Sequence, residues 1–369
     1  MILVFTSLSY QLSAQKKQKA FIDTLDNALD VSYYLSNLNG LLPIVSPITE
    51  PAVGYGAVAA GLFFIEKKEK KEKKFQIPDI AAVAGGYTES ATWFAGGGYI
   101  GFWKDDHIRY RGLLGYGDIK LKYYGNGQEF FANNPAKFTI NSLFFLQQVV
   151  FRLGESDFLL GAKYQLGKSK VSFLENSPFP NLKPKELEFT NSGLGLIAEY
   201  ESLNTIFSPT KGIRANITYN QFLTVLGGDR DFGVLSAYFI YHHHIIKDRW
   251  HGAYRTETQF SVGKTPFYMK PFVFLRGVPA MRYQGQLTAL IETEQEFSLT
   301  KRWSLVGFGG YGHAFKDFDN MDVGSDAWSA GAGFRYMIAR LFGLKMGVDV
   351  ARGPEQWALY VVFGNSWIR

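Results

Sequence analysis

The sequence contains no cysteine, and this absence rules out disulfide bridges and cysteine-ligated metal sites. It also lacks any run of about 18 apolar residues, the length that a membrane-spanning helix needs. Charged residues make up only 20% of the 369 residues, which is little for a soluble enzyme. If the chain lies in a membrane, it must therefore cross that membrane as a closed sheet of strands.

Glycine and aromatic residues are abundant, with 39 Gly and 16% Phe, Trp and Tyr. This mixture is typical of an all-β protein with long strands. In residues 212–220 the odd positions are apolar and most even positions are polar, and residues 192–201 and 250–261 alternate in a similar way. A soluble sandwich can show this alternation too, but aromatic residues at the strand ends favour an antiparallel transmembrane β-barrel with a polar interior.

The pattern predicts about sixteen strands, the first near residues 42–49 and the last near residues 357–367. An even number puts both termini on the same side, the periplasm, as in outer-membrane barrels of Gram-negative bacteria. Counting up and down from there places residues 263–286 outside the cell and the tight turn at residues 154–157 on the periplasmic side. The barrel is expected to occupy residues 41–369.

The segment before the barrel contains no predicted strand. Residues 1–15 are mostly apolar or hydroxylated and end in small residues, which indicates the remnant of a signal peptide. Residues 16–40 are then a short periplasmic segment, and the charge run at residues 66–74 is a periplasmic loop. The net charge of +6 comes largely from this run and from lysines 16–19, so nucleic acid is not an expected partner.

One predicted strand carries three glutamates on a single face. Glu292, Glu294 and Glu296 share that face because side chains alternate along a strand. A loop with Arg276 and Arg282 comes just before them. We expect this loop to be tethered to the acidic face, which must then line a polar interior.

Residues that resemble enzyme sites have simpler explanations. The glutamates could be the acid and base of a glycoside hydrolase, but a charged barrel interior explains them more economically. His242, His243 and His244 could offer two imidazoles to a metal, yet no acidic third ligand is nearby in the sequence. Gly-x-Gly pairs lie in strands with no helix after them, so they are not phosphate loops. We therefore expect no catalytic residue, metal or cofactor.

Three motifs carry a family resemblance. A strand at residues 194–200 leads to a turn, a long loop contains an Arg-Gly pair, and the closing strands cover residues 331–336 and 357–367. The turn residues are Pro209, Thr210 and Gly212, and the loop residues are Leu275, Arg276, Gly277, Arg282 and Tyr283. Over about residues 43–367 the chain is similar to the barrel domain of the BamA/TamA family, the bacterial surface antigen type of outer-membrane protein.

The resemblance implies that the extracellular loop folds into the barrel. Arg276 would then reach Glu294 on the inner wall, where Glu292 and Glu296 flank it, and Arg282 could take one of those two. Arginine suits this task because its planar fork can bind a carboxylate in two places.

The chain departs from the family pattern in two places. Gly310 stands where the family carries an aspartate, which removes an expected second acidic partner of Arg276. Residues 16–40 are too short for a periplasmic POTRA domain, so the resemblance implies a barrel-only member. Function therefore transfers less directly than fold.

The resemblance also implies a mechanism, a weak seam between the first and last strands. Pro43 and Pro47 support it, since each removes a hydrogen-bond donor from the first strand, and Trp357 and Phe363 lie in the last. The implied role is insertion or translocation of proteins, or of lipid, at the outer membrane. Its partners would be outer-membrane lipid and client proteins.

Two other roles stay open from the sequence. One is a passive channel or structural barrel, whose selectivity would come from arginines facing the interior. The other is an accessory subunit of a larger outer-membrane assembly machine.

Overall fold

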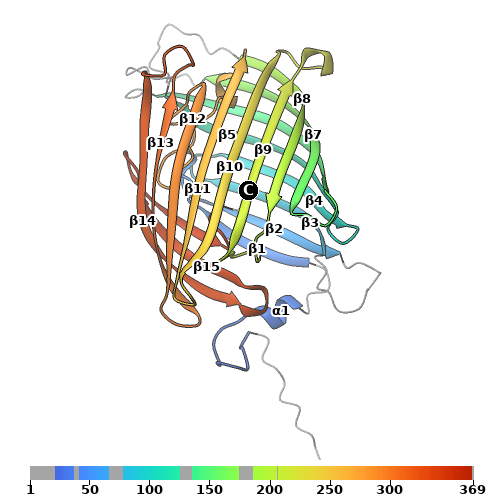
Figure 1. The fold of residues 1–369 in the computed structure, drawn as a ribbon. Coiled ribbons are helices and arrows are strands. Elements are labelled where there is room, and N and C mark those ends of the chain that lie inside the picture. Colours follow the sequence, from blue (N-terminus) through green and yellow to red (C-terminus); the bar gives the residue numbers. More distant parts are fainter. Residues whose placement is uncertain are drawn as a thin grey trace, which may run out of the picture.

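The computed structural model of the chain describes residues 21–36, 41–65, 78–124, 135–173, 186–205 and 207–367. Sixteen antiparallel strands form one sheet in sequence order, curled into a barrel (Figure 1). The expected all-β barrel and its strand number are confirmed. The predicted signal-peptide remnant and the charge run at residues 66–74 lie outside the described residues. No helix in the described part of the chain is long and apolar enough to cross a bilayer.

The strands lengthen from the first towards the middle of the chain. The first eight are β1 (Leu41–Ile48), β2 (Gly56–Ile65), β3 (Asp79–Thr88), β4 (Trp93–Trp103), β5 (Ile108–Tyr123), β6 (Ala136–Arg152), β7 (Phe158–Phe173) and β8 (Glu186–Glu201). The other eight are β9 (Gly212–Phe222), β10 (Phe232–Ile246), β11 (Trp250–Gly263), β12 (Leu287–Ser298), β13 (Trp303–Phe315), β14 (Gly324–Ala339), β15 (Leu344–Arg352) and β16 (Trp357–Phe363). The helical elements are short: α1 (Ser32–Ser36), η1 (Thr224–Leu226), η2 (Phe267–Met269) and η3 (Arg340–Phe342).

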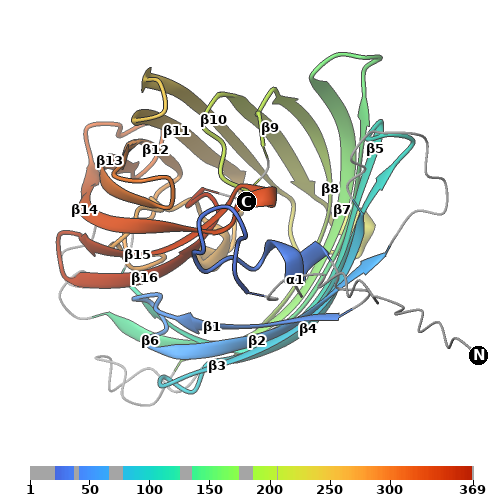
Figure 2. The same ribbon diagram turned by 90° about the horizontal axis from the view of Figure 1, so that it is seen from below.

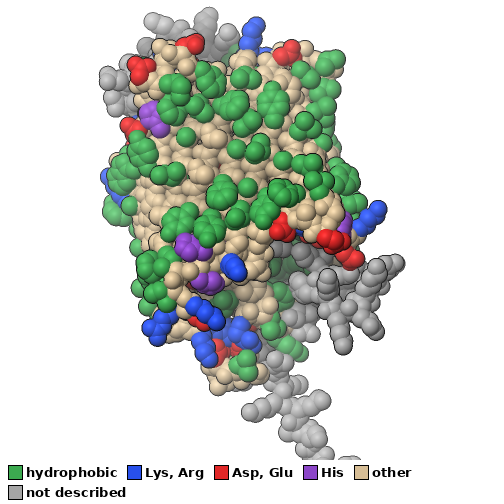
Figure 3. Space-filling model, in the orientation of Figure 1, with side chains coloured by type: hydrophobic (Ala, Val, Ile, Leu, Met, Phe, Trp, Pro, Cys, Tyr) green, Lys and Arg blue, Asp and Glu red, His purple; other side chains and the backbone are tan. Residues whose placement is uncertain are grey.

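The alternation in the sequence sorts side chains between the two faces of the wall. On β8 and β9, Leu196 and Ile217 point outward and are 70% and 55% exposed. The register pair next to Ile217 is Glu199 with Asn216, and its side chains point into the lumen. Asn216 Nδ2 donates to Glu199 Oε1 at 3.1 Å. On the face of the barrel seen in Figure 3, apolar side chains cover the middle and charged ones gather towards the two ends. This is the surface that a lipid bilayer requires.

The loop between β11 and β12 closes one end of the barrel from within. Its residues Val273, Leu275 and Val278 are buried against the wall at Leu290 and Ala314. A second apolar cluster joins the same loop to the opposite wall at β5 to β8. Its members include Met281 and Phe267 from the loop and Phe138, Val171 and Phe189 from the wall. Because the loop packs on both walls, it is a fixed plug.

The sheet has two edges, β1 and β16 (Figure 2). Every other pair of neighbouring strands is joined by a hydrogen-bonded ladder, but none joins β1 to β16 among the described residues. The last strand ends at Phe363, so the expectation that it runs to residue 367 is wrong. Gly364 has a φ of 72°, a left-handed conformation that suits glycine, and there the chain leaves the sheet.

Candidate functional site: a charged cluster behind the seam

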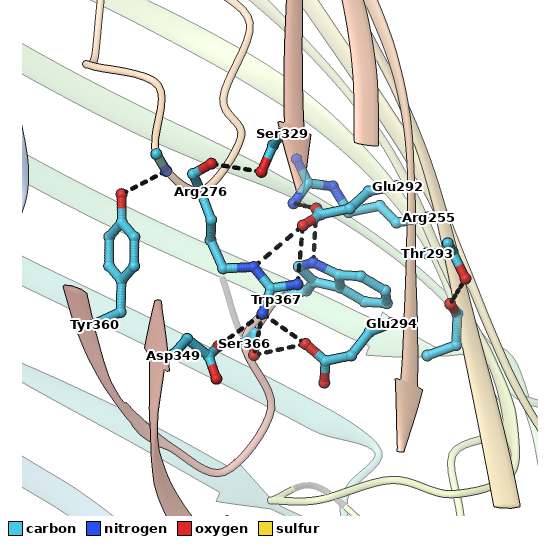
Figure 4. Close-up of polar contacts among 12 residues, drawn as sticks. Arg255, Arg276, Glu292, Thr293, Glu294, Ser329, Asp349, Tyr360, Ser366 and Trp367 are labelled. Carbon is cyan, nitrogen blue, oxygen red and sulfur yellow. Dashed lines mark hydrogen bonds and ion pairs between the residues drawn. The ribbon is translucent and has the colours of Figure 1, made fainter. Parts of the chain in front are cut away.

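The inner face of β12 presents its three glutamates in a row. Opposite them on β11, Glu292 faces Arg255, Glu294 faces Ala253 and Glu296 faces His251. The side chains of Glu292, Glu294 and Glu296 therefore point into the lumen, as the period of two predicts. Figure 4 shows the first two converging on a single arginine.

That arginine is Arg276, which the inward loop carries to the wall (Figure 4). Its Nη1 donates to Glu294 Oε2 at 2.7 Å, and its Nη2 donates to Glu292 Oε1 at 3.0 Å. Nη1 also donates to Asp349 Oδ2 on β15 at 2.8 Å. The guanidinium carbon lies 3.5 Å from the ring centroid of Phe308, a cation–π contact. One side chain thus ties the loop to β12, β13 and β15.

Two further arginines complete the cluster. Arg255 Nη1 donates to Glu292 Oε2 at 3.1 Å, and Arg335 Nη2 donates to Asp349 Oδ2 at 3.0 Å. Arg255 Nη2 also pairs with Glu257 Oε2 at 3.2 Å. Three guanidinium groups therefore face four carboxylates, those of Glu257, Glu292, Glu294 and Asp349. Each carboxylate has an arginine partner, which offsets part of the cost of its desolvation.

The backbone of the loop is fixed by hydrogen bonds to other strands. Ser329 Oγ on β14 donates to Arg276 O at 2.6 Å, and Gly277 N donates to the hydroxyl of Tyr360 on β16 at 2.8 Å. Gly277 has a φ of 84°, and a Cβ there would lie 2.9 Å from Gly353 N. Only glycine fits both that conformation and that close approach.

Gly310 makes room for the loop. A Cβ at Gly310 would lie 2.8 Å from Leu275 Cδ2, and a Cβ at Gly312 would lie 2.5 Å from Val273 Cγ1. The expectation that Gly310 deprives Arg276 of a second acidic partner is wrong, because Glu292 and Asp349 fill that role. Asp349 escaped the sequence reasoning. Its only sequence signal is that it is the single acidic residue among the residues of β15.

The last described residues, Ser366 and Trp367, enter the same cluster. Trp367 Nε1 donates to Glu292 Oε2 at 2.8 Å, and Ser366 Oγ donates to Glu294 Oε2 at 3.1 Å. The sequence predicts strand here, and nothing in the local pattern distinguishes strand from an inward turn. The cluster therefore lies directly behind β16, one of the two edges.

Two other predicted site residues have different partners. The expectation that Arg282 pairs with Glu292 or Glu296 is wrong. Arg282 Nε pairs with Glu355 Oε1 at 3.0 Å, and Tyr283 OH donates to the same oxygen at 2.6 Å. Glu296 pairs instead with Lys345 Nζ at 2.5 Å. Arg282 lies six residues beyond Arg276 in the loop, where its guanidinium carbon is 4.6 Å from the ring centroid of Tyr124.

The predicted turn between β8 and β9 is held by one side chain. Asn204 Oδ1 accepts hydrogen bonds from the backbone N–H groups of Thr210, at 3.0 Å, and Lys211, at 3.1 Å. Pro209 precedes these donors, and Gly212 has a φ of 116° with a would-be Cβ 2.3 Å from Ser202 O. The turn lies at the opposite end of the barrel from the inward loop and does not contact the charged cluster.

The four predicted seam residues lie on the two edges. On β1, Pro43 and Pro47 are in register with Gly61 and Ala57 of β2. On β16, Trp357 and Phe363 point outward and are 67% and 44% exposed. The edges therefore present apolar side chains towards lipid.

The N-terminal segment is attached below the end of the barrel that lies opposite the plug (Figures 1 and 2). Arg302, in the turn before β13, pairs with Asp23 at 2.6 Å, Asp26 at 2.6 Å and Asp30 at 2.5 Å. Val31 N donates to Ile338 O at 2.8 Å. The described part of this segment thus holds the β12–β15 end of the sheet while its chain continues to β1. Sequence reasoning missed this attachment.

The aspartates of this segment titrate below their ordinary range. A hydrogen bond from Arg340 lowers the pKa of Asp23 to about 2. A hydrogen bond from Arg302 lowers the pKa of Asp26. These carboxylates remain ionised, and the attachment intact, at any pH near neutral.

In the described residues, no group of three His, Asp or Glu side chains is placed to hold a metal ion. His242 is buried in the lumen, with its ring 6.2 Å from that of His251 and 6.3 Å from that of Trp367. The ion pairs and hydrogen bonds of the cluster join the inward loop to the barrel wall, and they also hold Ser366 and Trp367 against that wall.

Comparison with known proteins places this geometry in context. Residues 118–279 match the Omp85 superfamily domain. The fold is similar to that of BamA from Haemophilus ducreyi lacking POTRA domains 1–3, with a TM-score of 0.59 and 13% identity over 88% of this chain and 70% of that one. It is also similar to CdiB from Escherichia coli, with a TM-score of 0.57 and 12% identity over 87% of this chain and 61% of that one.

CdiB from Acinetobacter baumannii has a TM-score of 0.53 and 10% identity, over 88% of this chain and 59% of that one. The chain therefore spans about three fifths of the length of the CdiB structures. None of the curated proteins compared with the sequence matches it. At such low identities the structural likeness establishes the fold.

Proposed function

Because residues 118–279 match the Omp85 superfamily domain and the fold is similar to that of BamA, we propose that the chain assists the insertion or translocation of polypeptide at the outer membrane of a Gram-negative bacterium. The expected BamA/TamA-like barrel agrees with both comparisons, and the role in insertion or translocation is what we propose, together with its client. The observation that carries the proposal is the missing ladder between β1 and β16. An unpaired edge can add an incoming strand by backbone hydrogen bonding.

The prolines of β1 support this use of the edge. Pro43 and Pro47 are four residues apart, so their missing N–H groups lie on the same side of the strand. The β1–β2 ladder runs unbroken past both of them, and proline is tolerated only on the side away from a ladder. The edge facing β16 thus lacks two donors, which weakens any closed form of the seam.

The plug supports a route through the wall. Because the inward loop packs on both walls, the lumen offers no straight passage at that end. The charged cluster holds this plug next to β16, and Tyr360 of β16 accepts from the loop directly. A strand arriving at the edge would therefore meet a supported surface.

Cross-linking the seam tests the proposal. The chain has no cysteine, so pairs placed along β1 and β16 can be screened for the one that oxidises without background. The locked barrel should lose the ability to speed insertion of an unfolded small barrel protein into proteoliposomes, measured by heat-modifiable gel mobility. Reduction should restore it.

A matched control uses Ala198→Cys and Ile217→Cys, a register pair on β8 and β9, away from the two edges of the sheet. This cross-link should leave insertion unchanged. Full activity of the seam-locked barrel would rule out the seam mechanism. Co-purification from native membranes separates a barrel that acts alone from an accessory subunit.

A further inference from the structure

Lysines gather on the outer face of β5, β6 and β7, at the end of the barrel where the plug enters. Leu121, Phe138 and Val171 pack inward in the cluster that includes the loop residues. Their chain neighbours must therefore point outward. These neighbours are Lys120, Lys122, Lys137 and Lys170, and Lys168 shares the face of Lys170.

The lysines begin where the apolar outer surface stops. On β6 the outward positions from Phe151 to Leu143 are apolar apart from Gln147, and the next ones are Asn141, Thr139 and Lys137. Eight residues at about 3.4 Å each, tilted by about 40°, rise roughly 20 Å, close to the apolar band of about 25 Å in such barrels. The lysines therefore lie at the level of the lipid headgroups.

Two of these lysines directly oppose each other. Lys122 and Lys137 are register partners on β5 and β6, where like charges destabilise a sheet. No ion pair within the described residues joins Lys120, Lys122, Lys137 or Lys168 to a carboxylate. Three acidic residues belong to this part of the wall: Glu188 and Glu186 are the register partners of Lys170 and Ser172, and Asp118 lies one outward position below Lys120. An anion from outside the chain would relieve the repulsion.

The group is also shaped to hold such an anion. Beside the lysines on this face are Ser172 and Asn141, whereas Thr139, the register partner of Ser172, is buried. Lys122 and Lys137 are exposed, so their ammonium groups can reach a ligand while their stems lie along the wall.

We propose that Lys120, Lys122, Lys137 and Lys168 form a binding surface for a phosphorylated lipid of the outer leaflet. Phosphate is favoured because lysine binds it as a point charge, and several lysines can share one headgroup that carries more than one phosphate. The proposal goes beyond the seam. It needs only that this end of the barrel faces the outer leaflet.

The test is a lipid titration of the full chain in neutral detergent, followed by native mass spectrometry. The probes are a bis-phosphorylated glycolipid and the same glycolipid without phosphates. A variant with Lys120→Gln, Lys122→Gln, Lys137→Gln and Lys168→Gln should bind the phosphorylated probe about tenfold more weakly than the parent.

The control removes the same charge from the other end of the barrel, with Lys104→Gln, Lys211→Gln, Lys247→Gln and Lys301→Gln. It should bind like the parent. Unchanged binding by the first variant, an equal loss in the control, or equal binding of the phosphate-free probe would each overturn the proposal.

A smaller variant guards against a folding defect. Lys122→Gln with Lys137→Gln removes the like-charge pair, so it should melt no lower than the parent in neutral detergent. The phosphorylated probe should raise the melting temperature of the parent by more than that of this double variant. An equal rise would count against the lysine surface.

Discussion

Replacing Arg276 by glutamine should release the plug without opening the barrel. Two of its three acidic partners keep another cation, since Glu292 retains Arg255 and Asp349 retains Arg335. Glu294 keeps only Arg335, whose Nη2 lies 3.7 Å away. Removing one partner of a buried ion pair costs about 3 to 5 kcal/mol of stability. Because Arg255 and Arg335 remain beside the carboxylates, we expect the loss here to be about 3 kcal/mol.

The loss should appear in the loop. Hydrogen exchange of residues 273–283 should quicken by about a hundredfold, since every 1.4 kcal/mol is a factor of ten. The heat-modifiable mobility of the barrel should stay as in the parent, because the strand ladders do not involve this side chain. Exchange in the loop that stays at the parental rate would refute the assignment of Arg276 as the main anchor.

A double variant separates charge balance from lost contacts. Arg276→Gln with Glu294→Gln removes one charge of each sign and so keeps the net charge of the parent cluster. It should recover part of the exchange protection relative to Arg276→Gln alone, and the difference measures the coupling between the two residues. If Glu294→Gln instead added its full cost to that of Arg276→Gln, the pair would not be coupled.

Three further predictions follow from the same geometry. Gly310→Ala should displace the loop and speed its hydrogen exchange, whereas Gly307→Ala, with no atom within 4 Å of the added Cβ, should not; equal effects would contradict the role given to Gly310. The N-terminal segment should detach only in strong acid, because the pKa of Asp23 is lowered to about 2. The stabilisation that ionised Asp23 gives to the attachment is complete above the ordinary pKa of 3.8 and is lost as the pH falls towards about 2. Cleavage of residues 21–36 by pepsin should rise over that interval and not above it, and Arg302→Gln, but not Lys301→Gln, should permit it at higher pH. In planar bilayers the barrel should show only rare, brief openings, because the plug packs on both walls. Arg109, Arg255 and Arg335 are held by carboxylates, so they should not attract anions from solution. A large, steady, anion-selective current would support the passive channel instead.

Much of the fold was predictable because a barrel wall has a simple rule. In β8 and β9 each residue faces either lipid or lumen, so the alternation of Leu196 and Ile217 with Glu199 and Asn216 directly predicts strand and face. The same rule placed Glu292 and Glu294 on the inner wall. Counting strands up and down placed the inward loop at the end opposite the β8–β9 turn.

The sequence could not predict contacts between distant segments. The pairing of Arg302 with Asp23, Asp26 and Asp30 joins residues more than 270 positions apart, and no period links them. The predicted partner of Arg282 was wrong for the same reason, because the residues of a loop follow no regular repeat from which the direction of each side chain could be predicted.

The sequence by itself therefore determined the class of fold, the number of strands and the two faces of each strand, because side chains alternate along every strand of a barrel. Only the tertiary structure decided that Asp349 and Glu292 join Glu294 in holding Arg276, that residues 364–367 turn into the lumen, and that β1 and β16 lack a ladder. These three features depend on how the curled sheet brings its two edges and its inward loop together. That meeting is a property of the curvature of the whole barrel, which no local pattern records.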